Sequence, residues 1–239
     1  VLVFPGQSLT SEQFVAAAEA FGPIGADPYF VPMVDGSPVV RLSREADETS
    51  TIFADVMHSD WSFLASPPAG TMLCAVEVPP TGGDTLFADQ YAAYASLPPE
   101  LAARIDGLQG VHSARHGYSP RGAYGDRDRD SGRTMAIRIS EEALATQLHP
   151  LVRRHPETGR PALFVSLAYT IGIDGMDDAE ALALIGELLP YTQAPEVTYR
   201  HRWEPGMVVL WDNRCLLHAA TGGYEGHRRE LHRLTIAER

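Results

Sequence analysis

Two histidines and one aspartate have the residue types and the spacing needed to hold a divalent metal ion. His58 and Asp60 are two positions apart, so in an extended segment both side chains leave the same face and can reach one ion. His218 adds a second imidazole from a distant part of the chain. Two imidazoles and one carboxylate are typical of non-haem Fe(II) sites that keep coordination positions open. A His-x-Asp pair also arises by chance in a chain with nine histidines, so a structural role is the alternative.

A second group of chemically informative residues lies near the end of the chain. Residues 207–236 are predicted to form two apolar strands joined by a turn that contains glycines, with His218 just before the turn. In the second strand Arg229 and Arg233 share one face, because side chains of a strand alternate with a period of two. If that face is buried, each guanidinium needs an anionic partner. An ordinary solvated strand face is the alternative.

The elements that must position these side chains are mostly short strands. Apolar and β-branched runs bounded by glycine or proline predict strands over residues 1–4, 38–42, 71–78, 86–88, 151–152, 162–167, 197–203 and 207–210. Helical spacing predicts a helix after a capping box at Thr10 and Gln13, a helix pair over 90–107 divided by Pro98-Pro99, and helices over 140–148 and 177–189. This pattern predicts a mainly β fold, a sandwich or jelly roll with flanking helices.

Residues 113–135 carry the weakest apolar signal in the chain. They contain several glycines and a run of alternating aspartates and arginines. Such a composition favours a surface loop or lid. We expect this segment to be poorly ordered without substrate and to become protected when substrate binds.

Length and charge limit the organisation of the chain and its partners. With 239 residues we predict one domain over 1–239. The net charge of -12 argues against nucleic acid and anionic membranes, which both attract basic surfaces. No apolar run approaches the roughly 20 residues of a membrane span. The chain begins inside a predicted strand without a methionine, so we expect that its natural N-terminus is missing.

The two cysteines indicate a reducing compartment. Cys74 and Cys215 lie inside apolar runs and lack the spacing of a disulfide framework. We therefore expect free thiols and a cytoplasmic location. The oligomeric state is open, with a homo-oligomer as one possibility.

Three segments carry a resemblance to a known family. They are His58-Ser59-Asp60-Trp61-Ser62-Phe63, Gly82-Gly83-Asp84-Thr85-Leu86-Phe87-Ala88, and Trp211-Asp212-Asn213-Arg214 followed by His218, Arg229 and Arg233. In this order the chain resembles the taurine and phenoxyacetate dioxygenases, which are Fe(II)- and 2-oxoglutarate-dependent oxygenases. The resemblance covers nearly the whole chain and implies the double-stranded β-helix, or jelly-roll, fold of that family.

The resemblance also implies a role for each matching residue. His58, Asp60 and His218 match the catalytic Fe(II) ligands. Thr85 and Arg229 match the positions that hold the distal carboxylate of the co-substrate 2-oxoglutarate, and a guanidinium suits a buried carboxylate.

The implied reaction uses O2 to hydroxylate a C–H bond of a small organic molecule and releases succinate and CO2. One alternative is a different oxidation at the same site, such as desaturation, cyclisation or an isonitrile-type reaction. Another is a non-catalytic jelly roll that only binds metal.

Arg233 predicts the kind of substrate. It lies four residues after Arg229 on the same strand face, roughly 13 Å away at about 3.3 Å per residue, so the two arginines cannot share one carboxylate. In the family the matching arginine commonly meets a substrate anion, which implies an anionic substrate here. The alternative is an internal ion pair of Arg233 with Asp212 or Glu230. The aspartate at 27 would repel a sulfonate, which argues against taurine itself.

Two tyrosines are further candidates for contact with the substrate. Tyr118 lies in the predicted lid and Tyr169 follows a predicted strand. Both are predicted to line the pocket, although an aromatic side chain at such a place is often part of the core.

Overall fold

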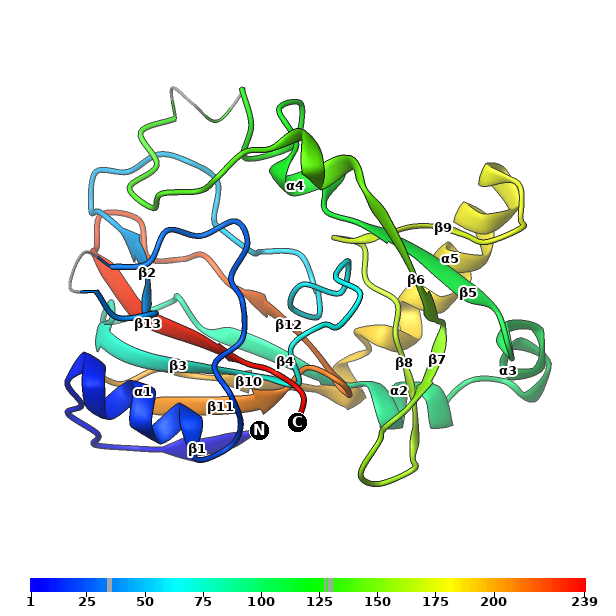
Figure 1. Cartoon of the computed structure of the whole chain (residues 1–239), viewed down its shortest axis with the longest axis horizontal. Coiled ribbons are helices and arrows are strands. Elements are labelled where there is room, and N and C mark those ends of the chain that lie inside the picture. Colours follow the sequence, from blue (N-terminus) through cyan, green and yellow to red (C-terminus); the bar gives the residue numbers. More distant parts are fainter. Residues whose placement is uncertain (34–35, 127, 129–130) are drawn as a thin grey trace.

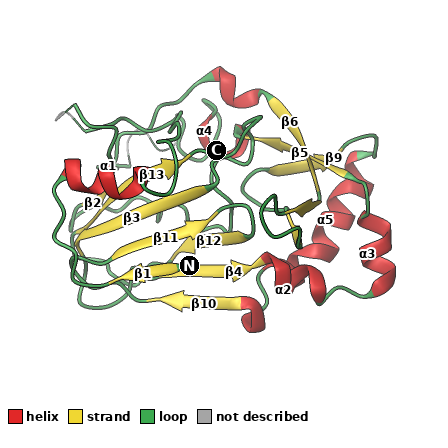
Figure 2. Ribbon diagram, turned by 60° about the horizontal axis from the view of Figure 1, so that its bottom comes forward, coloured by secondary structure: helices red, strands yellow, loops and turns green. Residues whose placement is uncertain are grey.

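The computed structural model of the chain contains two facing β-sheets, with helices and smaller sheets packed at one end (Figures 1 and 2). It describes residues 1–33, 36–126, 128 and 131–239. The strands are β1 (Leu2–Phe4), β2 (Val40–Arg44), β3 (Gly70–Glu77), β4 (Thr85–Asp89), β5 (Gln109–Ser113), β6 (Thr146–Pro150), β7 (Val152–Arg154), β8 (Pro161–Leu163), β9 (Thr170–Ile173), β10 (Thr198–His201), β11 (Val208–Asp212), β12 (Leu216–Ala220) and β13 (Arg229–Ile236). The helices are α1 (Ser11–Glu19), α2 (Gln90–Ala95), α3 (Pro99–Ile105), α4 (Arg115–Tyr118) and α5 (Asp178–Thr192), with 3-10 helices η1 (Glu141–Leu144) and η2 (Pro195–Val197).

The larger sheet has the strand order β1-β11-β3-β13-β2, and its neighbouring strands are antiparallel. Helix α1 covers one face, where Phe14 and Ala18 pack against Met72, Leu234 and Ile236. The predicted capping box at the start of α1 is confirmed, since the side chains of residues 10 and 13 each bond the backbone of the other. The opposite face of the larger sheet is thereby left free to face the smaller sheet.

The smaller sheet has the order β10-β4-β12 and faces the larger one. Phe87 and Trp203 from its side meet Leu73, Trp211 and Leu231 from the larger sheet in one buried cluster. Two antiparallel sheets packed on a common core form a jelly roll. The predicted fold class is confirmed.

Helices α2, α3 and α5 pack with strands β7, β8 and β9 at one end of the jelly roll (Figure 1). Their apolar stripes, including Leu101, Ile105, Leu184 and Leu188, form a separate core. The predicted division of the helix pair is confirmed, because Pro99 begins α3, where a missing N–H costs nothing. The helix predicted from residue 177 is confirmed as α5, capped by Asp177.

Two local predictions are wrong. Residues 207–236 form three strands instead of two, because an Asx turn at Asp212, whose side chain accepts from Arg214 N at 2.9 Å, takes the chain from the larger sheet into the smaller one. Residues 140–148 form only the short η1 and then β6, because 146–150 pair with β5. Strand pairing outweighs local helical spacing there.

Within the described part of the chain, no helix is long and apolar enough to cross a membrane. Cys74 and Cys215 are free thiols, as predicted.

Candidate active site

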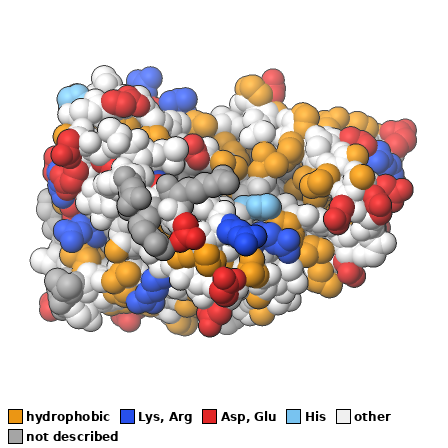
Figure 3. All heavy atoms as spheres, turned by 90° about the horizontal axis from the view of Figure 1, so that it is seen from above, with side chains coloured by type: hydrophobic (Ala, Val, Ile, Leu, Met, Phe, Trp, Pro, Cys, Tyr) orange, Lys and Arg blue, Asp and Glu red, His pale blue; other side chains and the backbone are white. Residues whose placement is uncertain are grey.

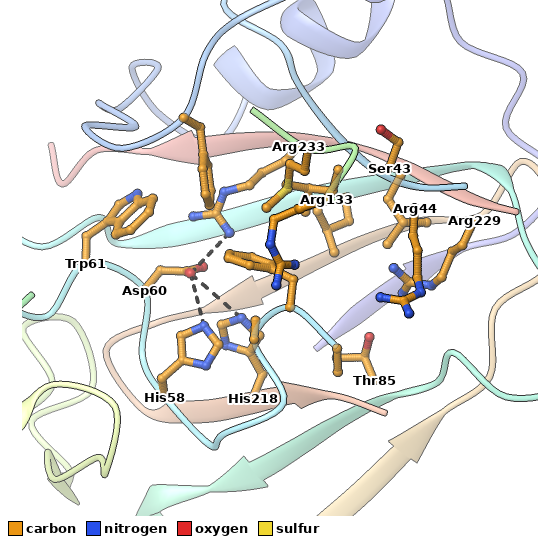
Figure 4. Close-up of a pocket in the computed structure, with 18 of the residues that line it drawn as sticks. Ser43, Arg44, His58, Asp60, Trp61, Thr85, Arg133, His218, Arg229 and Arg233 are labelled. Atoms are coloured by element: carbon orange, nitrogen blue, oxygen red, sulfur yellow. Dashed lines mark hydrogen bonds and ion pairs between the residues drawn. The ribbon is translucent and has the colours of Figure 1, made fainter. Parts of the chain in front are cut away.

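One pocket between the two sheets is lined by all eight side chains predicted as site residues, and Figure 4 labels all of them except the two tyrosines. These are His58, Asp60, Thr85, Tyr118, Tyr169, His218, Arg229 and Arg233. The pocket contains about 820 Å³ of empty space, part of it open to solvent. Apolar and aromatic side chains with a few converging polar groups line this space, as is usual for a small-molecule site.

The metal-binding triad is assembled by a backbone bridge between distant segments. His58 N donates to His218 O at 2.9 Å and His218 N donates to His58 O at 2.8 Å, which fixes the loop before Asp60 against β12. His58 Nε2 and His218 Nε2 then lie 3.6 and 3.8 Å from Asp60 Oδ1. The candidate ligand atoms of the triad all lie within 4.8 Å of one another. Figure 4 shows the three side chains converging on one point.

Both imidazoles can present a lone pair at this point. His58 Nδ1 lies 2.8 Å from the carbonyl of Val56, and a carbonyl accepts a hydrogen bond, so Nδ1 carries the proton and Nε2 is free. Burial lowers the pKa of His218 to about 3, so this ring is neutral near pH 7. Neutral imidazoles are the form that binds metal.

Asp60 is ionised and held in place. Burial on its own would raise the pKa of Asp60, but Arg233 and the two histidines hold that pKa well below its usual value. Thr71 Oγ1 donates to Asp60 Oδ2 at 2.6 Å, and this leaves Oδ1 toward the histidines. Asn213 Nδ2 in turn donates to Thr71 Oγ1 at 2.8 Å. The donor set and its support fit a divalent ion such as Fe(II).

Arg229 is a half-buried cation without an ionic partner among the described residues. Its Nη2 donates to Gly83 O at 3.0 Å, whereas its Nε is buried with no hydrogen-bond partner. Burial lowers the pKa of Arg229. Thr85 Oγ1 accepts from Trp203 Nε1 at 3.0 Å, so its hydroxyl hydrogen is left to donate elsewhere. Thr85 and Arg229 could together hold a carboxylate.

Arg233 differs from Arg229, because the fold supplies its partners. Its Nε donates to Asp27 and its Nη1 to Asp60, both at 3.1 Å. The premise that its counter-ion must come from a substrate is wrong. The alternative partners weighed from the sequence are not used either, since Asp212 pairs with Arg214 and His155, and Glu230 pairs with Arg228 and His232.

Aromatic side chains form the wall of the pocket next to the metal ligands. Tyr118 and Tyr169 are both buried, and burial raises the pKa of each phenol. The ring centroid of Tyr169 lies 5.9 Å from that of His58, and the centroid of Tyr118 lies 5.6 Å from that of Trp61. Both tyrosines line the pocket beside the triad, as predicted.

The segment predicted as a lid contributes to this wall. Of residues 113–135, positions 127, 129 and 130 lie outside the described residues. The described part contributes Tyr118, Arg133 and Met135 to the pocket. Arg133 Nη2 donates to Thr51 O at 3.2 Å and its guanidinium lies 5.1 Å from the Tyr124 ring centroid. A change of order on substrate binding stays a prediction.

Sequence reasoning missed several pocket residues. Arg44 on β2 is the cross-strand neighbour of Arg229 and lines the pocket, with Glu48 as its ion partner. Arg133 and Trp61 were not singled out either. Trp61 directly follows Asp60, whereas only strand register and loop packing bring Arg44 and Arg133 to the pocket, and neither has a local sequence signal.

Comparisons with known proteins agree with this geometry. The profile of the family "Taurine catabolism dioxygenase TauD, TfdA family" matches residues 1–235. The chain is 36% identical to the alpha-ketoglutarate-dependent 2,4-dichlorophenoxyacetate dioxygenase of Cupriavidus pinatubonensis over 253 residues, covering 100% of this chain and 84% of that protein. It is 36% identical to the (S)-phenoxypropionate/alpha-ketoglutarate-dioxygenase of Sphingobium herbicidovorans, covering 92% of this chain and 76% of the relative.

A solved structure shares the fold as well as the sequence pattern. The crystal structure of a taurine dioxygenase from Burkholderia xenovorans matches with a TM-score of 0.77 and 33% identity, covering 99% of this chain and 75% of that one. The chain therefore belongs to the TauD, TfdA family of Fe(II)- and 2-oxoglutarate-dependent dioxygenases.

Proposed function

We propose that this protein hydroxylates a C–H bond of a small organic molecule, using Fe(II), 2-oxoglutarate and O2. The observation that carries the proposal is Arg229, whose buried Nε has no hydrogen-bond partner and which has no ionic partner among the described residues. It lies in the same pocket as a buried triad of two histidines and one aspartate. A module that only stores metal has no need for a second, cationic site beside the metal.

Each part of the pocket has a distinct role in this proposal. His58, Asp60 and His218 would hold Fe(II) through one nitrogen or oxygen each. Thr85 and Arg229 would bind the distal carboxylate of 2-oxoglutarate. Fe(II) held there would supply the oxidising chemistry, in which O2 and 2-oxoglutarate are consumed and succinate and CO2 are released. The protein holds the co-substrate and the target C–H bond in register and excludes water.

Tyr118, Tyr169 and Arg233 would contact the substrate. They line the pocket on the side of the triad where the aromatic rings gather. Two relatives are named for phenoxyacetate and phenoxypropionate compounds. Aromatic walls suit a substrate with a planar or apolar body of this size.

The proposal also covers the domain organisation, the cellular location and the partners of the protein. We assign residues 1–239 to one oxygenase domain in the cytoplasm, and the free thiols support that compartment. Basic side chains on the face shown in Figure 3 stand in small groups among acidic and hydrophobic ones. Together with the net charge of -12, this supports a small-molecule partner over nucleic acid or a membrane surface. A homo-oligomer is compatible with the proposal.

The test is to form the chelate without oxygen. Fe(II) and 2-oxoglutarate added anaerobically should give a weak visible charge-transfer absorption in the wild-type protein. The Asp60→Ala protein should lose this absorption and release no succinate under air, because two neutral imidazoles are left to hold the ion. The exposed Asp174→Ala is the matched control and should behave as wild type. An Asp60→Ala protein with the normal absorption would refute the triad.

A further inference from the structure

We propose that Asp27 is the built-in counter-ion of Arg233, so that the substrate end of the pocket accepts an uncharged molecule with a hydrogen-bond acceptor and disfavours an anion. This inference rests on the proposed function and specifies the substrate class of the same site. It reverses the anionic substrate expected from the sequence.

Arg233 is enclosed by groups that fix its orientation. Its side chain is 4% exposed, and the guanidinium carbon lies 5.3 Å from the ring centroids of both Phe30 and Trp61. Nε donates to Asp27 and Nη1 donates to Asp60. Figure 4 shows the guanidinium directed from β13 toward Asp60. Arg233 has no freedom to seek another anion without breaking a buried ion pair.

Asp27 is held as firmly as the arginine that it neutralises. Trp61 Nε1 donates to Asp27 Oδ1 at 2.9 Å, and Thr235 Oγ1 donates to Oδ2 at 3.4 Å. The loop that carries Asp27 is itself fixed to the end of β13, since Gly25 N donates to Thr235 O at 2.8 Å and Ala237 N donates to Pro23 O at 2.8 Å. This pair is therefore part of the folded framework.

The charges around Arg233 are already balanced. Asp27 offsets its single positive charge, and Asp60 adds a second carboxylate that the metal site would share. A substrate anion would be a further negative charge in a region that water does not screen. Arg229 shows the contrast, because no described carboxylate pairs with it.

One donor of Arg233 is still available for a neutral group. Its Nη2 is buried without a hydrogen-bond partner, and an unpaired buried donor is costly. A carbonyl or ether oxygen can accept from it without bringing charge. The aromatic lining from Phe30, Trp61, Tyr118 and Tyr169 suits the rest of such a molecule.

The test titrates a small anion and its neutral isostere, acetate and acetamide. The protein is kept with Fe(II) and saturating 2-oxoglutarate without oxygen, so that Arg229 is occupied. Apparent affinities come from the rise in the thermal unfolding midpoint. The variant is Asp27→Asn, whose amide oxygen can still accept from Trp61. The matched control is Glu230→Gln, which removes one negative charge from the same strand outside the pocket lining.

Acetate should bind the Asp27→Asn protein at least about tenfold more tightly than it binds the wild-type or Glu230→Gln protein. The reason is that the substitution removes a negative charge next to the bound acetate, and repulsion between buried like charges changes affinity by more than a factor of ten. Acetate should also restore part of the stability that the substitution removes, whereas acetamide should not distinguish the variants. If Asp27→Asn does not fold, Asp27→Ser is used.

Two results would overturn the proposal. The first is a wild-type protein that binds acetate as tightly as the variant does. The second is a variant that gains no affinity for acetate. The visible absorption of the Fe(II) chelate is recorded in the same samples, so failure of the oxygenase assignment appears as loss of that absorption in the wild-type protein and is separate from either result.

Discussion

Arg229 and Arg233 are four residues apart on one strand, and the fold gives them different surroundings. Arg233 meets Asp27 and Asp60, whereas Arg229 contacts the carbonyl of Gly83 and the ring of Tyr224 within the described chain. Residue type and period predicted that both guanidiniums share one face of the strand, and both line the pocket. They could not predict which of the two lacks an ionic partner, because Asp27 is about two hundred positions away in the sequence.

At the residue scale, removing the Arg229 guanidinium should weaken 2-oxoglutarate binding without changing Fe(II) binding. Arg229→Ala is expected to weaken that binding by about 2–5 kcal/mol, the usual cost of truncating a buried charged pair. Anaerobic titration of the Fe(II) protein with 2-oxoglutarate, followed by the visible absorption of the chelate, measures this change. Fe(II) affinity should be close to that of wild type.

The neighbouring Arg228 supplies the control for this prediction. It forms ion pairs with Glu45, Glu77 and Glu230 and does not line the active-site pocket. Arg228→Ala should leave the 2-oxoglutarate titration unchanged. If the two variants behave alike, Arg229 has a structural role and the co-substrate site lies elsewhere.

At the scale of elements, local sequence signals predicted helix boundaries better than they predicted strand pairing. The capping box at Thr10, the break at Pro98-Pro99 and the cap at Asp177 are each confirmed, because each rests on a contact within a few residues. Strands β5, β6 and β9 were missed, because their segments are short and weakly patterned and become a sheet only by pairing with one another.

A glycine turn before β4 helps to position the proposed co-substrate site. Gly82 has a φ of +73°, and a Cβ added there would lie 2.2 Å from the carbonyl oxygen of Gly223. The backbone contact is continued by Gly83 N, which donates to Gly222 O at 3.1 Å. This close approach joins the turn before Thr85 to the loop that leads to β13. The distance between Thr85 and the strand that carries Arg229 therefore depends on it.

Gly82→Ala should move Thr85 relative to Arg229. We expect a raised 2-oxoglutarate requirement and a loss of unfolding free energy of about 1–3 kcal/mol, because the new methyl group meets rigid backbone. Gly226→Ala is the matched control, since Gly226 has a φ of +79° and open space around its Cα. Gly226→Ala should lose only the unfolding free energy that a side chain at positive φ costs. Succinate release against 2-oxoglutarate concentration and urea unfolding separate the two variants, and equal behaviour would contradict the close-approach argument.

At the scale of the whole molecule, the fold class was predictable and the composition of the pocket was only partly so. Short strands and the order of the motifs led to the jelly roll and to the triad. Arg44 and Arg133 line the pocket, and Asp27 pairs with Arg233, which also lines it. Their positions depend on how the loops pack over the sheets, and a single sequence has no periodic signal for that packing.

The interior of the molecule also contains a buried histidine away from the pocket, and it should make stability depend on pH. Burial lowers the pKa of His112 to about 3, with His149 adding to the effect. His112 Nδ1 lies 3.0 Å from Ser62 Oγ and its Nε2 is buried without a partner. The ring is thus neutral in the folded protein, while the unfolded chain protonates it with a pKa of about 6.5.

The sign of this effect follows from linkage. Between about pH 6.5 and pH 3 the unfolded state binds one more proton at this position than the folded state, so stability falls as the pH falls through this window. The slope is at most about 1.4 kcal/mol per pH unit for one proton. His112→Gln, whose amide can keep the contact with Ser62, should reduce the slope by one proton. Urea unfolding of the metal-free protein between pH 5 and 8 measures it, with the exposed His227→Gln as control. A His112→Gln protein with the wild-type slope would show that His112 is protonated in the folded state. The assignment of a neutral ring to His112 would then be wrong.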